Sequence, residues 1–478
     1  MNDTPARPKR PYLEVTGPAR TRRYRHFWEH SGAPTALTDT PLLDQRLGEI
    51  LQSDLPAAMQ APFQSKQAIA NAQLERVARL VRHAAEIPVY QEKFRRAGLT
   101  PGRIDSWEEF RKIPPITKPE LQAVFPQGCV HSSVQRDLAF QTRSSGSSGM
   151  SLPIMVDLEA IATDTLHGVR QFSLQSGLRY QSLDTVANVY TVPWWTGTID
   201  GLYINHFISS LISPPLIAGI LAELRSEVLS LYPSNLEALL PHRERWHHPA
   251  LRLIVTHSEQ SSRATRRQWG QAIGVPVLDE YSSEEGMRIA LECPCGHYHS
   301  CDDTVIVEIL DPKTMLPQRP GKAGLVVITN LLNHAMPFIR YVQGDLATAG
   351  AGVDCAIQWG SIENIQGRVN DAFLTRAGNL VPAGSLLDVT YRMMYDNGIN
   401  LRRFELVQID YDIVHLRAPG DIDRHELEAA RRRLSELLSV AMEHPVKVEL
   451  VISRNSTSSV PGPRSKHRPI KRQFNPQP

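Results

Sequence analysis

The stretch RSSGSSGMSLPI, from Arg143 to Ile154, decides how the rest of the chain is interpreted. Glycine and serine leave a chain unrestrained, which is typical of a flexible linker. The same residues suit a phosphate-binding loop, because glycines permit the unusual backbone angles that turn N–H groups toward an anion, and hydroxyls add uncharged donors. Gly146 and Gly149, with four flanking serines, supply both features. Composition alone therefore leaves linker and phosphate loop open.

The residues after this run favour the loop. A strand-like piece and then a long helical segment follow at once, in LPIMVDLEAIATDTLHGVRQFSLQSG (152–177). Strand, glycine loop and helix together form a context for anion binding. A Walker A loop would end in Lys followed by Ser or Thr, whereas Met150 and Ser151 stand here, which disfavours an ordinary P-loop NTPase.

Length and composition limit the class of protein. The 478 residues exceed the size at which one hydrophobic core usually stops growing, so we expect two or more domains. A net charge of +2 gives no argument for nucleic acid as a partner. The run nearest to a membrane span, 207–224, is broken by Pro214 and Pro215, and the basic N-terminus lacks the apolar core of a secretory signal. We therefore expect a cytoplasmic protein without a membrane partner.

The pattern of apolar residues, and with it the expected secondary structure, changes twice along the chain. Apolar residues at helical spacing in 72–98, and a capping box of Ser106 and Glu109, predict that the first 140 residues are largely helical. After about residue 184, β-branched runs alternate with helical segments, which indicates a mixed α/β domain whose strands are antiparallel after about residue 300. The last hundred residues predict two strands, an amphipathic helix and another strand, a separate small α+β unit.

Several motifs, in one order along most of the chain, resemble the adenylate-forming superfamily of acyl- and aryl-CoA ligases, in particular its phenylacetate-CoA ligase-like branch. The family's loop reads roughly Ser-Ser-Gly-Thr-Thr-Gly-Lys-Pro, and Met150 replaces its lysine. Six residues match the first six positions: Ser144, Ser145, Gly146, Ser147, Ser148 and Gly149. AAEIPVYQEKFRRAGLTPGRIDSWEEFRKIPPITKPEL (84–121) is similar to the family's N-terminal helical signature, whereas residues 1 to about 60 match nothing in it.

Two further motifs resemble parts of the family's nucleotide site. YSSEE (281–285) is similar to Tyr-Gly-x-Ser/Thr-Glu, which implies that Tyr281, followed by Ser282, stacks on adenine and that Glu285 is associated with magnesium. Ser282 and Glu284 depart from the family pattern. MPFIRYVQGDLA (336–347) is similar to Arg-Tyr-Arg-Thr-Gly-Asp, which implies that Asp345 holds the ribose hydroxyls with Arg340 nearby.

The hinge and the tail carry the remaining resemblance. IQGRVNDAF is similar to the family's hinge segment, which implies Arg368 as a ribose or phosphate ligand and places Asn370 at the hinge. VPGPRSKHRPIKRQF (460–474) is similar to Gly-Gly-Lys-x-Arg, whose lysine contacts the acyl carboxylate and the α-phosphate. We expect Lys466 in that role, with Lys471 as the alternative.

The segment ECPCGHYHSCDD (292–303) has a density of thiol and imidazole groups that zinc coordination would explain. The resembled branch commonly shows a Cys six residues before a His, matched here by Cys293 and His299, and a later Cys-x-Cys-Gly segment, of which Cys355 remains. We expect a structural zinc site from these three residues, with Cys295 or Cys301 as the fourth ligand. A degenerate site without metal is the alternative.

The resemblance implies an α/β fold with a large domain and a small mobile one. A large N-terminal adenylate-forming domain, with a helical first part and mixed sheets, would span 61–370, and a small mobile α+β C-terminal domain would span 371–478. An extension of unknown role would precede them at 1–60. The implied acid pocket lies in VYTVPWWTGTIDGLY (189–203), with an aromatic acid as the guessed substrate. Its expected contacts are Tyr190, Trp194, Trp195 and Gly197.

The implied chemistry is the activation of a small carboxylic acid by ATP and Mg²⁺, giving an acyl- or aryl-adenylate, followed by transfer to coenzyme A after rotation about residue 370. One alternative is a ligase that makes an amide or ester with a small-molecule amine or alcohol. Another is a non-catalytic nucleotide- or acyl-binding relative.

Overall fold

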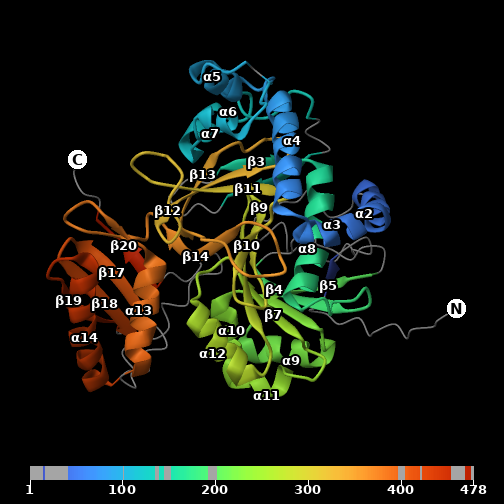
Figure 1. Cartoon of the computed structure of the whole chain (residues 1–478). Coiled ribbons are helices and arrows are strands. Elements are labelled where there is room, and N and C mark those ends of the chain that lie inside the picture. Colours follow the sequence, from blue (N-terminus) through green and yellow to red (C-terminus); the bar gives the residue numbers. More distant parts are fainter. Residues whose placement is uncertain are drawn as a thin grey trace.

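A computed structural model of the chain describes residues 14–16, 41–100, 102–134, 139–144, 152–191, 202–396, 404–419, 423–453 and 469–474. Figure 1 shows a large part that extends from the blue helices to the yellow and light-orange strands, and a smaller orange and red part beside it. The predicted α/β fold class is confirmed, with one large mixed sheet covered by helices. Among the described residues, no helix combines the length and the apolarity that a membrane crossing requires.

Short capped helices make up the first part of the chain, as predicted. The helical spacing over 72–98 belongs to two helices, because Pro88 begins a new one after the turn at 85–87. Ser106 accepts a hydrogen bond from the Glu109 backbone N–H at 3.2 Å, so the predicted cap is present. The helices are α2 (Pro41–Ser53), α3 (Leu55–Gln60), the 3-10 turn η2 (Ala61–Phe63), α4 (Lys66–Ala84), α5 (Pro88–Arg96), α6 (Trp107–Lys112) and α7 (Lys118–Val124).

Part of the N-terminal segment 1–60, which resembles nothing in the ligase family, belongs to the large unit. Helices α2 and α3 pack on α8 (Leu158–Gln175), and Leu47, Ile50 and Ala58 are buried in the main core. The short strand β1 (Glu14–Thr16) extends the large sheet by pairing with β5 (Ile204–Ser209). Residues 41–60 therefore contribute to the same core as the residues that follow them.

The large sheet is parallel at one end and antiparallel at the other. Its described strands follow the order β1-β5-β4-β6-β7-β8-β9-β10-β14-β13-β12-β11. Strands β5, β4, β6, β7 and β8 are parallel neighbours, and every pair from β8–β9 onward is antiparallel, slightly earlier in the chain than predicted. The remaining bounds are β4 (Thr185–Tyr190), β6 (Val228–Leu231), β7 (Leu253–His257), β8 (Val277–Ser283), β9 (Met287–Glu292), β10 (Tyr298–Ser300), β11 (Val305–Leu310), β12 (Ala323–Asn330), β13 (Tyr341–Ala349) and β14 (Ser361–Arg368).

Helices cover both faces of the parallel end. α8 is buried along nearly its whole length against the face that carries Val186 and Val228. The opposite face, with Ala187 and Val189, forms a second cluster with the lower green helices of Figure 1. These helices are α9 (Pro214–Leu224), α10 (Pro233–Leu239), the 3-10 turn η3 (Leu240–His242), α11 (Arg243–Trp246) and α12 (Arg263–Ile273). Side chains alternate between faces along a strand, so this division fixes which residues face α8.

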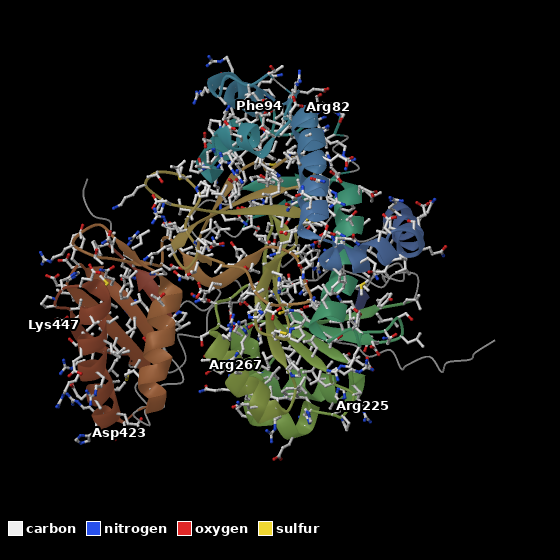
Figure 2. All side chains as sticks on the ribbon, viewed as in Figure 1. Arg82, Phe94, Arg225, Arg267, Asp423 and Lys447 are labelled. Atoms are coloured by element: carbon white, nitrogen blue, oxygen red, sulfur yellow. The ribbon has the colours of Figure 1, made fainter. Side chains whose placement is uncertain are left out.

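The C-terminal part has its own core, which begins at Phe373 and ends at Ile470. Its sheet has the order β19-β18-β17-β20, and Asp423, labelled in Figure 2, caps its long helix by accepting from two backbone N–H groups. The elements are β15 (Phe373–Leu374), β16 (Leu380–Val381), α13 (Ala383–Asp396), β17 (Glu405–Asp410), β18 (Ile413–Pro419), α14 (Arg424–Met442), β19 (Lys447–Ser453) and β20 (Ile470–Arg472). The predicted two strands, helix and strand are all present.

Arg340 ties the N-terminal helices to the antiparallel end of the sheet. Its guanidinium donates to both carboxylate oxygens of Glu308, at 2.9 and 3.0 Å. It also donates to the backbone carbonyls of Arg111 and Ile113, at 2.6 and 2.7 Å. Only 4% of Arg340 is exposed, so these acceptors replace water around a buried charge.

We predict that Arg340→Ala lowers the free energy of unfolding by about 3–5 kcal/mol, because it leaves the Glu308 carboxylate without its buried partner. Urea denaturation followed by circular dichroism measures the change. Arg319→Ala, at an exposed turn, is the control and changes stability by less than about 0.5 kcal/mol. Equal effects of the two substitutions would contradict the role given to Arg340.

Candidate active site

The glycine–serine run connects the two strands of a hairpin. β2 (Phe140–Arg143) and β3 (Pro153–Val156) are antiparallel, with Arg143 opposite Pro153. Two hydrogen bonds of 2.9 Å close the loop, from the Ser144 N–H to the Leu152 carbonyl and from the Leu152 N–H to the Ser144 hydroxyl. The ends of the run are thus adjacent, which excludes a linker between domains. The predicted loop residues 145–149 lie outside the described residues.

The YSSEE motif lies directly beside this hairpin. Thr142 on β2 donates to a Glu284 carboxylate oxygen at 2.8 Å. Glu285 is buried and accepts a 3.0 Å hydrogen bond from the Tyr341 hydroxyl, while its backbone carbonyl accepts from the Asn330 amide at 3.0 Å. Burial raises the pKa of the Glu285 carboxyl above its ordinary value, and the Tyr341 hydrogen bond opposes that rise. The carboxylate is held in one orientation with little water around it.

Asp345 contacts two other predicted residues, Arg368 and Tyr281. β13 and β14 place Asp345 opposite Arg368 in their register, and the guanidinium Nε lies 3.2 Å from Asp345 Oδ1. The Tyr281 hydroxyl donates to Oδ2 at 2.7 Å. The Asp345 charge raises the pKa of Arg368 further, and burial raises the pKa of Tyr281 well above its ordinary value. Tyr281, Asp345 and Arg368 therefore form one hydrogen-bonded and ion-paired group.

One cavity connects these groups. It contains about 1340 Å³ of empty space, part of it open to solvent, between α8 and the carboxyl ends of the parallel strands. The sequence-predicted residues that line it are Ser144, Tyr190, Ser282, Glu285, Asp345 and Arg368. Trp194, Trp195 and Gly197, predicted for the acid pocket, lie outside the described residues. Motifs far apart in the chain thus meet at one place, as the resemblance implies.

Comparisons with known proteins find similar sequences and similar folds. No protein-family model matches the chain. Over 332 residues it is 27% identical to the phenylacetate-coenzyme A ligase of Thermus thermophilus, covering 65% of this chain and 72% of that protein. Over 339 residues it is 26% identical to the Pseudomonas putida phenylacetate-coenzyme A ligase, covering 66% and 74%. The structure of 2-hydroxyisobutyryl-CoA ligase with 2-HIB-AMP, in the post-adenylation state, has a TM-score of 0.71 at 18% identity, covering 87% and 91%.

The chain is thus similar to phenylacetate-coenzyme A ligases over 65–66% of its length, and it shares its fold with 2-hydroxyisobutyryl-CoA ligase.

Lys118 also lines the cavity of this ligase-like protein and was not predicted from the sequence as a site residue. It is the first residue of α7, whose cap, Thr117, is fixed by reciprocal hydrogen bonds with Glu120. The Ile116 N–H donates to the Arg340 carbonyl, just before β13, and the Ile116 carbonyl accepts from the Val342 N–H of β13, each at 2.9 Å. Burial lowers the pKa of Lys118, Glu285 opposes that shift, and Arg368 adds to it. A cation is thus held near the Glu285 carboxylate.

Two other predicted cations, Arg340 and Lys471, do not line the cavity. Arg340 contacts Glu308 and does not line the cavity. Lys471 is on β20 of the C-terminal sheet, where its ammonium group lies 2.5 Å from Glu405 Oε1. Lys466, the predicted catalytic lysine, lies outside the described residues.

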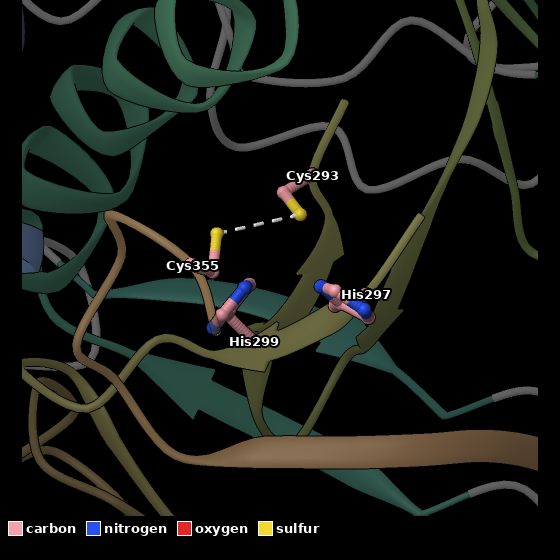
Figure 3. A group of neighbouring side chains, drawn as sticks. All are labelled: Cys293, His297, His299 and Cys355. Carbon is pink, nitrogen blue, oxygen red and sulfur yellow. Dashed lines mark hydrogen bonds between the residues drawn. The ribbon is translucent and has the colours of Figure 1, made fainter. Parts of the chain in front are cut away.

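The cysteine and histidine cluster is a separate site between the β9–β10 turn and the loop before β14. Figure 3 shows Cys293, His297, His299 and Cys355 directed toward one point, and their ligand atoms all lie within 4.8 Å of one another. The two sulfurs are 3.9 Å apart, far longer than the ~2.05 Å of a disulfide. Two thiolates each ~2.3 Å from a tetrahedral zinc ion would lie about 3.8 Å apart.

The histidines of this cluster also fit a metal. His299 Nε2 and His297 Nδ1 are buried and have no hydrogen-bond partner among the described residues. The other nitrogen of His299 lies 3.5 Å from the Trp359 carbonyl, in the way that a second-shell acceptor orients a ligating imidazole. Burial lowers the pKa of His299, which favours the neutral form that binds zinc.

The group that the structure brings together contains His297, whereas the sequence predicted Cys295 or Cys301 as the fourth ligand. Cys295 is exposed at the tip of the β9–β10 turn. Cys301 follows the end of β10 and is buried beside Arg170 and Arg288. His297 immediately precedes β10 and His299 lies within it, and both offer a ring nitrogen to the group.

Proposed function

We propose that the protein activates a carboxylic acid with ATP, forming an acyl-adenylate and pyrophosphate, and then transfers the acyl group to coenzyme A. This proposal rests on one cavity. Ser144, at the start of the glycine–serine loop, lines it together with Glu285, Asp345 and Arg368. The named activities of the phenylacetate-coenzyme A ligases that the chain resembles support the same reaction.

The ribose and adenine would bind at the Asp345 group. A carboxylate with a donor on each oxygen is fixed in orientation and keeps lone pairs for the two hydroxyls of a ribose. Arg368 would reach a ribose or phosphate oxygen from the same position. We assign Tyr281 and Ser282 to the adenine side, since both lie at the end of β8.

The phosphates would bind between the loop and Glu285. In the first step an oxygen of the substrate carboxylate attacks the α-phosphorus, and the bond from that phosphorus to the pyrophosphate oxygen breaks. Negative charge is redistributed among the phosphate oxygens, so positioned N–H donors and cations lower the barrier. Glu285 would hold Mg²⁺, which neutralises phosphate charge when bound. We assign Lys118 to the pyrophosphate. There it would supply the positive charge that the lysine of the family's loop provides, since Met150 replaces that lysine in this chain.

The second step would use rotation of a C-terminal domain, which we place at 371–478, beside an adenylation domain that contains 61–370 together with residues 41–60 of the same core. Separate cores for the two parts support this division. The TM-score with 2-hydroxyisobutyryl-CoA ligase is 0.71 for its post-adenylation state and 0.57 for its thioesterification state. The higher score supports a placement of the C-terminal part like that of the post-adenylation state. Lys466 would enter the cavity in that arrangement.

A panel of aliphatic and aromatic carboxylic acids tests the reaction by pyrophosphate release, with and without coenzyme A. We expect release with at least one acid, and a thioester when coenzyme A is present. Release without thioester formation would favour the amide or ester alternative. ATP binding without release for any acid would contradict adenylation and favour a non-catalytic relative.

Substitution of the lysines tests the assigned cations. We predict that Lys118→Ala lowers kcat/KM for pyrophosphate release about 10²–10³-fold, because one charge at the phosphates is lost. Lys112→Ala, an exposed neighbour paired with Glu108, is the matched control and changes it little. Lys466→Ala nearly abolishes adenylation with ATP binding retained. A larger effect of Lys471→Ala than of Lys466→Ala would assign the catalytic role to Lys471 instead.

We also assign a structural zinc ion to Cys293, His297, His299 and Cys355. It would join the β9–β10 turn to the loop that leads into β14 and Arg368, and so support the antiparallel half of the site.

Metal analysis of the purified protein tests this assignment. We predict about one zinc per chain, and its loss in Cys355→Ser together with a lower urea midpoint. Cys295→Ser, the exposed cysteine of the same turn, retains the metal and serves as the control. Zinc lost from Cys295→Ser but kept in Cys355→Ser would overturn the ligand set.

A further inference from the structure

The cavity extends away from the nucleotide residues into an inner chamber, which is bounded by Gly168 and Phe172 of α8, Asn188 of β4, Asn205 of β5, Ser230 of β6 and Arg288 of β9. It lies on the sheet face that is directed at α8, since Val186, two residues before Asn188, packs in the α8 cluster. If the proposed function holds, this chamber is where the acid's side group binds. The following inference rests on that function and concerns the chemistry of the acid.

The wall of the chamber suits a planar ring. Phe172 and Tyr180 are edge to face, with ring centroids 5.7 Å apart, and Tyr203 lies 5.5 Å from Tyr180. All three rings line the cavity. Aromatic groups favour such edge and offset contacts with one another, so a further ring would find the same kind of surface.

The floor of the chamber is polar, although the same strands carry valine beside it. Asn188 and Ser230 are opposite each other in the β4–β6 register and both line the cavity. The side-chain oxygen of Asn188 is buried and has no hydrogen-bond partner among the described residues. An unsubstituted ring over these groups would leave the buried acceptor unsatisfied, at a cost of about 1–3 kcal/mol.

The charges around the chamber are acidic on balance. Arg288 is ion-paired with Asp164 at 2.5 Å and donates to Gln171 at 2.9 Å. Gln171 in turn donates to the Glu280 carboxylate at 2.7 Å. Burial opposes ionisation of Glu280, but Arg288 and His257 lower its pKa below the ordinary value. Two carboxylates therefore accompany one guanidinium, which favours a ligand that donates hydrogen bonds over one that only accepts them.

The position of Arg288 depends on a glycine in the covering helix. A Cβ at Gly168 would lie 2.8 Å from Arg288 Nη2, so a larger residue there would displace the guanidinium. Glycine inside a helix costs roughly 1 kcal/mol relative to alanine. Gly168 thus makes α8 intrinsically less stable at the position where the Arg288 guanidinium borders the chamber.

We infer that the substrate is an aromatic carboxylic acid whose ring carries a hydrogen-bond donor, a hydroxyl or an amino group, directed at Asn188. A site built to accept such a donor discriminates strongly against the analogue that lacks it, because its polar groups then stay unpaired. An unsubstituted arylacetic or benzoic acid is a poor substrate for this chamber.

Matched acids test the inference by the initial rate of pyrophosphate release. The panel contains phenylacetate and benzoate with their 3- and 4-hydroxy, amino and methoxy derivatives. At least one hydroxy or amino acid should exceed its unsubstituted parent by about 100-fold in kcat/KM. The methoxy derivatives accept but do not donate, and should be no better than the parents.

Two variants locate the effect at Asn188. Asn188→Leu should reduce the preference for the donor-bearing acid at least about tenfold, and the isosteric Asn188→Asp, which keeps the acceptor, should retain it. ATP binding confirms that each variant is folded. Equal rates with parent and donor-bearing acids, or an unchanged preference in Asn188→Leu, would overturn the inference. Release of no pyrophosphate with any acid would instead contradict the proposed function itself.

Discussion

The position of β8 is the constraint on which the site depends. One edge of this strand pairs in parallel with β7 and the other edge is antiparallel to β9, so β8 joins the two halves of the sheet. Its end brings Tyr281 to Asp345 on β13 and brings Glu284 to the hairpin that holds the glycine–serine loop. The parallel half encloses the inner chamber and the antiparallel half carries the ion-paired carboxylate. A shift of β8 by one residue would turn its side chains to the opposite face and separate these groups.

Electrostatics in the cavity follow from burial. Glu285, Asp345, Arg368 and Lys118 border one cavity that is only partly open to solvent, where charges interact more strongly than in bulk water. Each has a partner or a neighbour of opposite charge, so the arrangement is stable before any ligand arrives. A phosphate that enters would meet donors already oriented by β13, α7 and the hairpin, which reduces the reorganisation that binding requires.

Local patterns predicted much of this structure. The Ser106 cap, the mixed sheet, the small C-terminal unit and the residues brought to the cavity all follow from periodicity or from motifs several residues long. Lys118 could not be found in this way, because its role depends on backbone pairing between Ile116 and a strand more than two hundred residues later. The place of His297 beside Cys293 and Cys355 depends on the fold of the turn before β10, which cysteine spacing does not reveal. Arg340 lies in a family-like motif, yet its contacts with Glu308 and the α6 end are set by tertiary packing.

The central claim is that the loop, the Asp345 group and the inner chamber serve one bound acyl-adenylate. A crystal structure with a stable sulfamoyl analogue of a hydroxyaryl-adenylate tests it most directly. We expect the ribose hydroxyls at Asp345, the sulfamoyl group between Ser144 and Lys118, and the ring hydroxyl at Asn188. An analogue bound with its ribose away from Asp345, or with its ring outside the chamber, would contradict the account.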